Sequence, residues 1–127
     1  VNPMVVEGQT LGGVAQGIGT AIYEEIEYDT NGQPNASTFA DYLLPGPAEI
    51  PNMRVFHTET PSPYTMYGIK GIGEGGAIAT PAVIFNAVND AQKSHGAELN
   101  KTPLTPHRLL EEIERAKSQK SIKKEVA

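Results

Sequence analysis

One glutamate in the sequence has neighbours that suit acid–base chemistry. Glu74 lies in the segment 68–76, where five of the nine residues are glycine and Lys70 is the one base. Glycine leaves room for a ligand to approach the carboxylate, and successive backbone amides can point at an anion. A carboxylate in such a setting can act as a general base. The residues leave a second interpretation open, in which Glu74 is a solvated side chain on a surface turn.

An amide side chain is the second candidate. Gln16 is the lone amide of the run 14–19, which otherwise consists of apolar residues and glycine. A buried amide needs hydrogen-bond partners. Gln16 can therefore donate to an oxygen of a ligand or tie down a neighbouring loop, and the residues do not choose between these two roles.

The glycines of residues 71–76 also satisfy the pattern G-x-G-x-x-G of dinucleotide-binding proteins. That fingerprint requires a hydrophobic strand before it and an acid about 20 residues after it. Here Pro61 and Pro63 precede the pattern, and Asp90 falls within an expected helix. A nucleotide-binding glycine loop is therefore a disfavoured alternative.

Both candidates must be positioned by glycine-rich chain. Apolar residues in 8–25 follow the spacing of a helix face, although Gly12, Gly13, Gly17 and Gly19 lie among them. Each glycine costs a helix about 1 kcal/mol relative to alanine, so these glycines predict close approach of another backbone or a ligand. Two further helices are expected, one at about 77–94 and one that opens at Thr105-Pro106.

The sequence patterns that indicate strands are shorter than those that indicate helices. Residues 26–28 and 53–57 alternate like strands, and the residues Asp29-Thr30-Asn31-Gly32 are typical of a turn. The order of elements predicts an α+β fold, with helices packed on a small mixed or antiparallel sheet.

Composition excludes several classes of protein. The 127 residues are 39% hydrophobic, enough for a modest core in one domain or in part of a larger one. The chain has no cysteine, so it holds no disulfide, thiolate zinc site or iron–sulfur cluster, and we expect a reducing, cytoplasmic location. A net charge of −5 disfavours nucleic-acid binding. The sequence contains no run of ~18 apolar residues, so it predicts no membrane-spanning helix. No metal-ligating residue is predicted, because metal-site spacing is absent among the histidines His57, His95 and His107.

Five runs of the sequence occur in a distinctive order. They are VNPMVVEGQTLGGVAQGIGTAIYEE, FADYLLP, TPSPY, GIKGIGEGGAIATPAVIFNAVNDA and TPLTPHRLLEEI. In this order and spacing they resemble the C-terminal end of a molybdenum hydroxylase large subunit, from the family of xanthine dehydrogenase, aldehyde oxidase and aerobic carbon monoxide dehydrogenase. The resemblance implies that residues 1–116 are the C-terminal portion of a molybdopterin-binding domain. The Lys-rich residues 117–127 fall outside it and are expected to form a charged, frayed tail.

The resemblance also implies a cofactor and site residues. The family cofactor is molybdenum held by molybdopterin, in its simple or cytosine dinucleotide form. The glutamate of the family's G-x-G-E motif falls on Glu74, as the general base that deprotonates the hydroxyl ligand of the metal. The family's Q-G-x-G glutamine falls on Gln16. We therefore expect cofactor contacts at Gln16, Gly17, Lys70, Gly71, Ile72 and Gly73.

The implied reaction is hydroxylation of an aldehyde, an N-heterocycle or carbon monoxide with oxygen derived from water. Residues Gly75-Gly76 stand where carbon monoxide and xanthine dehydrogenases often carry Ser-Pro or Pro-Pro, so the small-molecule substrate stays open. FAD and [2Fe-2S] clusters are expected on partner chains or domains, and the remainder of the large subunit completes the site.

Two properties of the separate chain follow from this interpretation. It is expected to be inactive, because most of the cofactor pocket lies outside it, and to self-associate through exposed apolar surface. The alternative is a non-catalytic assembly module of the same fold. A glutamate retained in so glycine-rich a loop, together with Gln16, favours the enzyme.

Overall fold

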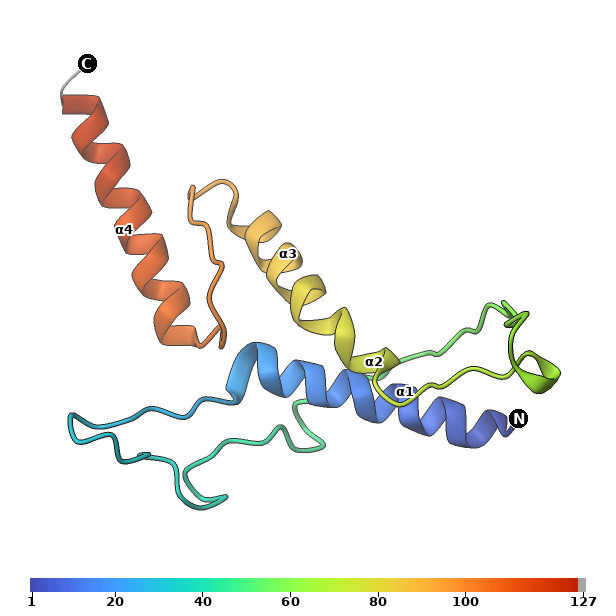
Figure 1. The fold of residues 1–127 in the computed structure, drawn as a ribbon. Helices are drawn as coiled ribbons and strands as arrows, with labels where there is room; N and C mark the ends of the chain where they lie inside the picture. Colours follow the sequence, from blue (N-terminus) through green and yellow to red (C-terminus); the bar gives the residue numbers. More distant parts are fainter. Residues whose placement is uncertain (126–127) are drawn as a thin grey trace.

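The computed structural model describes the backbone of residues 1–125, in which helices joined by long irregular segments form the whole architecture (Figure 1). In chain order the elements are α1 (Pro3–Ile18), the π-helix η1 (Gly19–Tyr23), the 3-10 helix η2 (Met66–Gly68), α2 (Gly75–Ile78), α3 (Thr80–Gln92) and α4 (Pro106–Glu125). The irregular chain between η1 and η2 extends past both ends of α1 (Figure 1).

The first helix begins earlier than its apolar pattern predicts. Asn2 caps it, because its side-chain oxygen accepts a hydrogen bond from the backbone N–H of Val5 at 3.4 Å, and Pro3 occupies the first turn. After Ile18 the helix widens into η1, and it ends at Glu24, whose backbone is extended. The predicted helix over 8–25 is confirmed, with its start moved to the capped Asn2-Pro3 pair.

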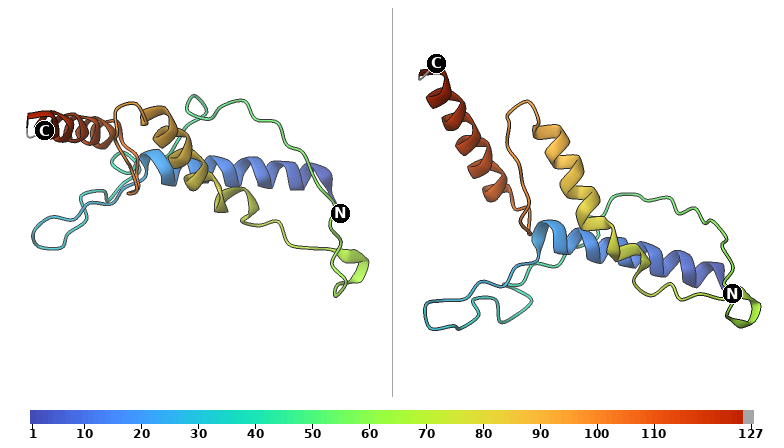
Figure 2. Two further views of the ribbon diagram at one scale, coloured as in Figure 1. Left: turned by 90° about the horizontal axis from the view of Figure 1, so that it is seen from above. Right: turned by 45° about the horizontal axis from the view of Figure 1, so that its top comes forward.

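Glycines bring α1 against α2 and the start of α3. A Cβ on Gly13 would lie 3.0 Å from the Cα of Gly76, and a Cβ on Gly17 would lie 2.5 Å from the Cβ of Thr80. A Cβ on Gly76 would overlap the carbonyl oxygen of Thr10. We call Gly13, Gly17, Gly76 and Thr80 the glycine seam. The predicted close approach of another backbone is confirmed here. Helix α1 and the segment formed by α2 and the start of α3 lie side by side in two further views (Figure 2).

Hydrogen bonds and an ion pair made by two side chains attach residues 97–104 and α4 to the rest of the molecule. Asn89 of α3 donates to the carbonyl oxygen of Leu99 and accepts from its N–H, both at 2.8 Å. Arg108 of α4 pairs with Glu25 and donates to the carbonyl oxygen of Pro103 at 3.0 Å. These contacts hold residues 97–104 between α3 and α4.

Strand pairing is sparse among residues 1–125. One isolated antiparallel bridge joins Tyr28 and Pro34 around the predicted turn. Within this turn the carboxylate of Asp29 accepts hydrogen bonds from the backbone N–H groups of Gln33 and Asn31, which lower the pKa of Asp29. Residues 53–57 have no paired neighbour in the described chain. The sheet of the expected α+β fold therefore stays a proposal for the complete domain.

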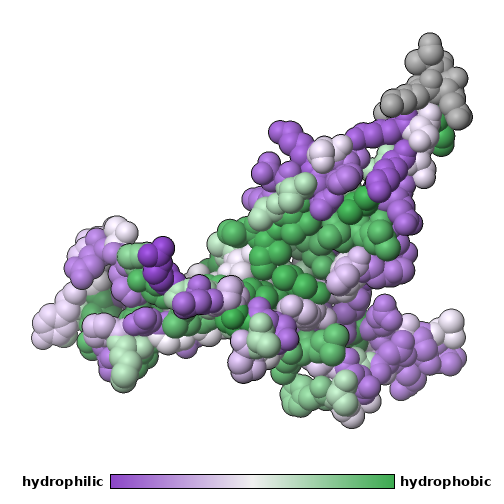
Figure 3. All heavy atoms as spheres, turned by 180° about the vertical axis from the view of Figure 1, so that it is seen from behind, coloured by the Kyte–Doolittle hydropathy of each residue, from purple (hydrophilic) through white to green (hydrophobic). Residues whose placement is uncertain are grey.

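The buried core is small. Its apolar members are Ile18, Ala21, Ala97, Leu99, Leu104 and Ala116. Many larger apolar side chains are exposed, and hydrophobic residues reach the surface in the middle of the molecule (Figure 3). Within residues 1–125, no helix combines the length and the apolar character that crossing a membrane requires. Helix α4 includes the Lys-rich residues as far as Glu125, and the rest of the predicted tail, 126–127, lies outside the described residues.

The glycine seam predicts an unusual response to a single methyl group. Gly76→Ala should lower the free energy of unfolding by about 1–3 kcal/mol, because the new Cβ overlaps the backbone of α1. Gly8→Ala is the matched control, since its Cβ would meet nothing within 4 Å, and it should stabilise α1 by about 0.5–1 kcal/mol. Urea unfolding followed by circular dichroism measures both changes. Equal stability of the Gly76→Ala variant and the parent would contradict the close approach.

The pair of hydrogen bonds between Asn89 and Leu99 gives a second prediction. Asn89→Ala leaves both backbone groups of Leu99, a residue only 6% exposed, without partners. A buried group without its hydrogen bond costs about 1–3 kcal/mol, so we expect a loss of stability of at least that size. Asn86→Ala, at an exposed position of the same helix, should change stability by less than about 0.5 kcal/mol. Similar unfolding midpoints for the two variants would argue against a stabilising role of the Asn89–Leu99 hydrogen bonds.

Candidate functional site

Glu74 stands at the point where an irregular glycine loop becomes helix. Its carbonyl oxygen accepts hydrogen bonds from the N–H groups of Ala77 at 2.9 Å and Ile78 at 3.2 Å, which fixes its backbone at the start of α2. Its side chain is exposed, and within the described chain its carboxylate makes no hydrogen bond or ion pair. The backbone of Glu74 is held while its carboxylate remains available.

The carboxylate belongs to an open hollow of about 610 Å³. The hollow is lined by Gly71, Ile72, Gly73, Glu74, Gly75 and Ile78. Its walls are therefore glycine backbone and two isoleucine side chains, with one acid. Such a surface suits a flat or bulky group that approaches the backbone closely and leaves a carboxylate at its edge.

Two glycines of this loop have no internal reason to be glycine. A Cβ on Gly71 or on Gly73 would meet nothing within 4 Å, and neither residue has a positive φ. This distinguishes them from Gly76, which α1 requires to be small, and from Gly68, whose φ is 70°. The space beside Gly71 and Gly73 is free for atoms from outside the described chain.

Gln9 of α1 holds the loop, and the sequence interpretation missed it. Its Nε2 donates to the carbonyl oxygen of Gly73 at 2.6 Å. Gln9 and Gln16 are seven residues apart, which places them on nearly the same face of a helix, about two turns from one another. That spacing was the available signal, because a second amide on the face of Gln16 can reach a neighbouring segment.

The other predicted residues occupy different surroundings. Gln16 is exposed on α1, does not line the hollow, and has no side-chain hydrogen bond to residues 1–122, whose side chains the structure describes. Gly17 is buried in the glycine seam against Thr80. Lys70 is exposed and donates to the side-chain hydroxyl of Thr60. The structure therefore brings Gly71, Ile72 and Gly73 together with Glu74, and leaves Gln16 on the adjoining helix.

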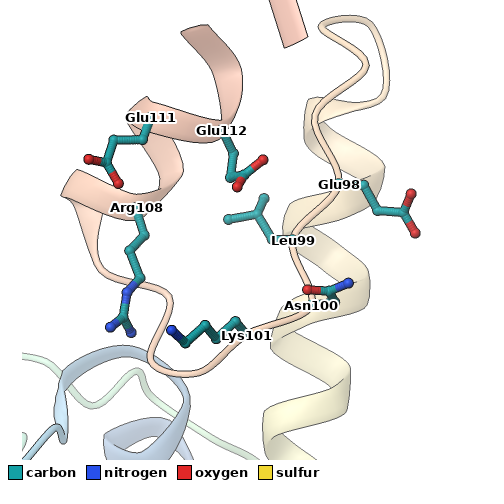
Figure 4. A pocket seen from close by; sticks show the side chains of 7 residues that line it. All are labelled: Glu98, Leu99, Asn100, Lys101, Arg108, Glu111 and Glu112. Carbon is teal, nitrogen blue, oxygen red and sulfur yellow. The ribbon is translucent and has the colours of Figure 1, made fainter. Parts of the chain in front are cut away.

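A second hollow, of about 220 Å³, lies between α4 and the segment that precedes it (Figure 4). It is lined by Glu98, Leu99, Asn100, Lys101, Arg108, Glu111 and Glu112. None of the predicted site residues lies there, and Arg108 is already engaged by Glu25. Among the side chains that the structure describes, those of residues 1–122, no three of His, Cys, Asp or Glu gather as a metal-binding group.

Comparison with known proteins connects this chain to one class of enzymes. Residues 1–51 match the family model of the molybdopterin cofactor-binding domain. The nicotine 6-hydroxylase large subunit of Paenarthrobacter nicotinovorans is 44% identical over 110 residues, which are 87% of this chain and 14% of that protein. The carbon monoxide dehydrogenase large chain of Afipia carboxidovorans is 40% identical over 91 residues, 72% of this chain and 11% of the relative.

A solved structure agrees in fold as well as in sequence. The crystal structure of quinoline 2-oxidoreductase from Pseudomonas putida 86 superposes with a TM-score of 0.87 at 45% identity, and the match covers 90% of this chain and 14% of that one. The chain thus spans between about one ninth and one seventh of the length of these relatives. Over that span, it belongs to the molybdopterin-binding large subunits of the molybdenum hydroxylases, the family of xanthine dehydrogenase, aldehyde oxidase and carbon monoxide dehydrogenase.

Proposed function

We propose that this chain supplies the catalytic base and part of the cofactor-binding surface of a molybdenum hydroxylase. The reaction is hydroxylation of an aldehyde, an N-heterocycle or carbon monoxide with oxygen derived from water. One observation carries the proposal. The unpaired carboxylate of Glu74 stands at an apolar hollow, between glycines whose outer faces are free.

The residues present fit the family cofactor. Gly71 and Gly73 leave space that a Cβ would fill, and the exposed amide of Gln16 has no partner among the described side chains. Peptide groups of Lys70 to Gly73 and the amide of Gln16 would hold a molybdopterin by hydrogen bonds and close contact. When bound, the molybdenum cofactor supplies the oxidising power and the reactive oxygen of the hydroxylation. Gly17 contributes by keeping α1 close to α3, which sets where Gln16 lies.

Glu74 provides the proton-accepting group. An ionised carboxylate only accepts hydrogen bonds, and either oxygen of Glu74 can take a proton from a group placed in the hollow. Ile72 and Ile78 flank it and would exclude water when the rest of the pocket is in place. The backbone hydrogen bonds from Ala77 and Ile78 keep the base from shifting as it gains the proton.

The substrate class has some support from relatives. Two proteins of 44% and 45% identity are named for nicotine and quinoline, which both contain nitrogen heterocycles. An N-heterocycle is therefore the substrate we would test first. FAD and [2Fe-2S] clusters would lie on partner chains or domains, in keeping with the relatives' names as large subunit and large chain.

Two other functions are less well supported. A nucleotide-binding glycine loop requires a strand before it, and residues 51–62 carry no regular structure. An assembly module without cofactor gives no physical reason for the free faces of Gly71 and Gly73 beside a carboxylate. The separate chain would still be inactive by itself, since its hollow is open to solvent and most of a pocket is missing.

Removing the base tests the proposed role. In the complete holoenzyme, Glu74→Gln should preserve molybdenum content and fold but lower kcat by at least ~10²-fold, because an amide cannot accept the proton. Glu114→Gln, at an exposed position of α4, is the matched control and should leave kcat unchanged. Steady-state kinetics with metal analysis measure both variants. Turnover within a factor of about two of the parent would exclude Glu74 as the base.

The exposed apolar side chains predict the behaviour of the separate chain. Phe39, Phe56 and Tyr64 are at least 82% exposed, and all three lie in the irregular chain between η1 and η2. Exposed apolar surface drives association, so residues 1–127 alone should elute as oligomers whose mass rises with concentration. Size-exclusion chromatography with light scattering tests this. A monomer at every concentration would contradict it.

A further inference from the structure

The loop that carries Glu74 is weakly held. Within residues 1–125, the segment 71–73 has a single hydrogen bond to the rest of the chain, from Gln9 to the carbonyl oxygen of Gly73. Gly71 and Gly73 have no side chain to restrict them, so this segment has wide conformational freedom. One contact therefore ties the segment 71–73 to α1.

The two sides of Glu74 are held differently. On the C-terminal side, Ala77 and Ile78 donate to its carbonyl oxygen, and Gly76 packs against α1. On the N-terminal side, the neighbouring carbonyl of Gly73 is held by the side chain of Gln9, 64 residues away in sequence. Gln9 and the seam residue Gly13 are one turn apart on α1, so one rigid helix fixes both ends of this short stretch.

We propose that Gln9 is a positioning residue for the catalytic base. By donating to the Gly73 carbonyl, its amide fixes the peptide that precedes Glu74 and thereby aims the carboxylate into the hollow. This inference rests on the proposed role of Glu74. Gln9 itself need not touch the substrate, because it acts through the loop.

The test uses Gln9→Met in the complete holoenzyme. Methionine has similar length but no N–H donor, so the loop loses its contact while α1 keeps a good helix former. Hydrogen exchange followed by mass spectrometry should show faster exchange of the amides in 71–75, with unchanged exchange in α3. We expect kcat to fall about tenfold, with KM changed less than twofold, since misplacement of a reacting group slows the chemical step. Glu7→Met, an exposed substitution on the same helix, is the control and should change neither exchange nor kcat.

A double variant separates this inference from the role of Glu74. If Gln9 acts only through the base, Gln9→Met should have no further effect on kcat in a Glu74→Gln enzyme. Should the Met variant lose its cofactor, Gln9→Asn is the second variant, because it keeps an amide that is one methylene too short to reach. The positioning role is overturned if the Gln9 variant that retains the cofactor shows unchanged hydrogen exchange in residues 71–75. This holds even if the Glu74→Gln enzyme is inactive. A further fall in kcat in the double variant would also overturn it, by showing that Gln9 acts independently of Glu74. A fully active Glu74→Gln enzyme would instead remove the proposed function itself.

Discussion

The close approach of two backbones at the glycine seam is the constraint on which the rest of the structure depends. Helix α1 has few large buried side chains, so its contact with α2 and α3 relies on the absence of Cβ atoms at Gly13, Gly17 and Gly76. Close contact of this kind maximises dispersion between backbone atoms and tolerates almost no added volume. The seam therefore supplies rigidity where the small core cannot.

The candidate site gains its geometry from that rigid contact. Glu74 lies directly beside the seam, and Gln9 extends the hold of α1 along the loop. Glycines thus serve two physical purposes within a few residues. Gly76 is small because α1 occupies the adjacent space, whereas Gly71 and Gly73 are small beside space that this chain leaves free. The second purpose is the stronger indication of a bound group.

Much of this arrangement could be predicted from the sequence. Glycines retained in an apolar helical pattern predicted close backbone approach, and Thr105-Pro106 predicted the start of α4, because both signals are local. The bond from Gln9 to Gly73 joins residues 64 apart. Helical spacing places Gln9 on the face of Gln16, but it does not identify Gly73 as the partner. The sheet stays a prediction for the same reason, since a strand such as 53–57 needs a partner that local pattern does not identify.

The direction of the chain at the seam has a consequence for how such proteins diversify. Residues 9, 13 and 17 of α1 meet residues 73, 76 and 80 in the same order, so the two segments run parallel and are joined by the long irregular chain between η1 and η2. Contacts at the seam, and not the length of that connection, set the alignment of Glu74 with α1. Because closure entropy grows only slowly with loop length, insertions there would cost little and leave the alignment unchanged. Evolution can therefore remodel this connection for new neighbours while the position of Glu74 against α1 stays constant.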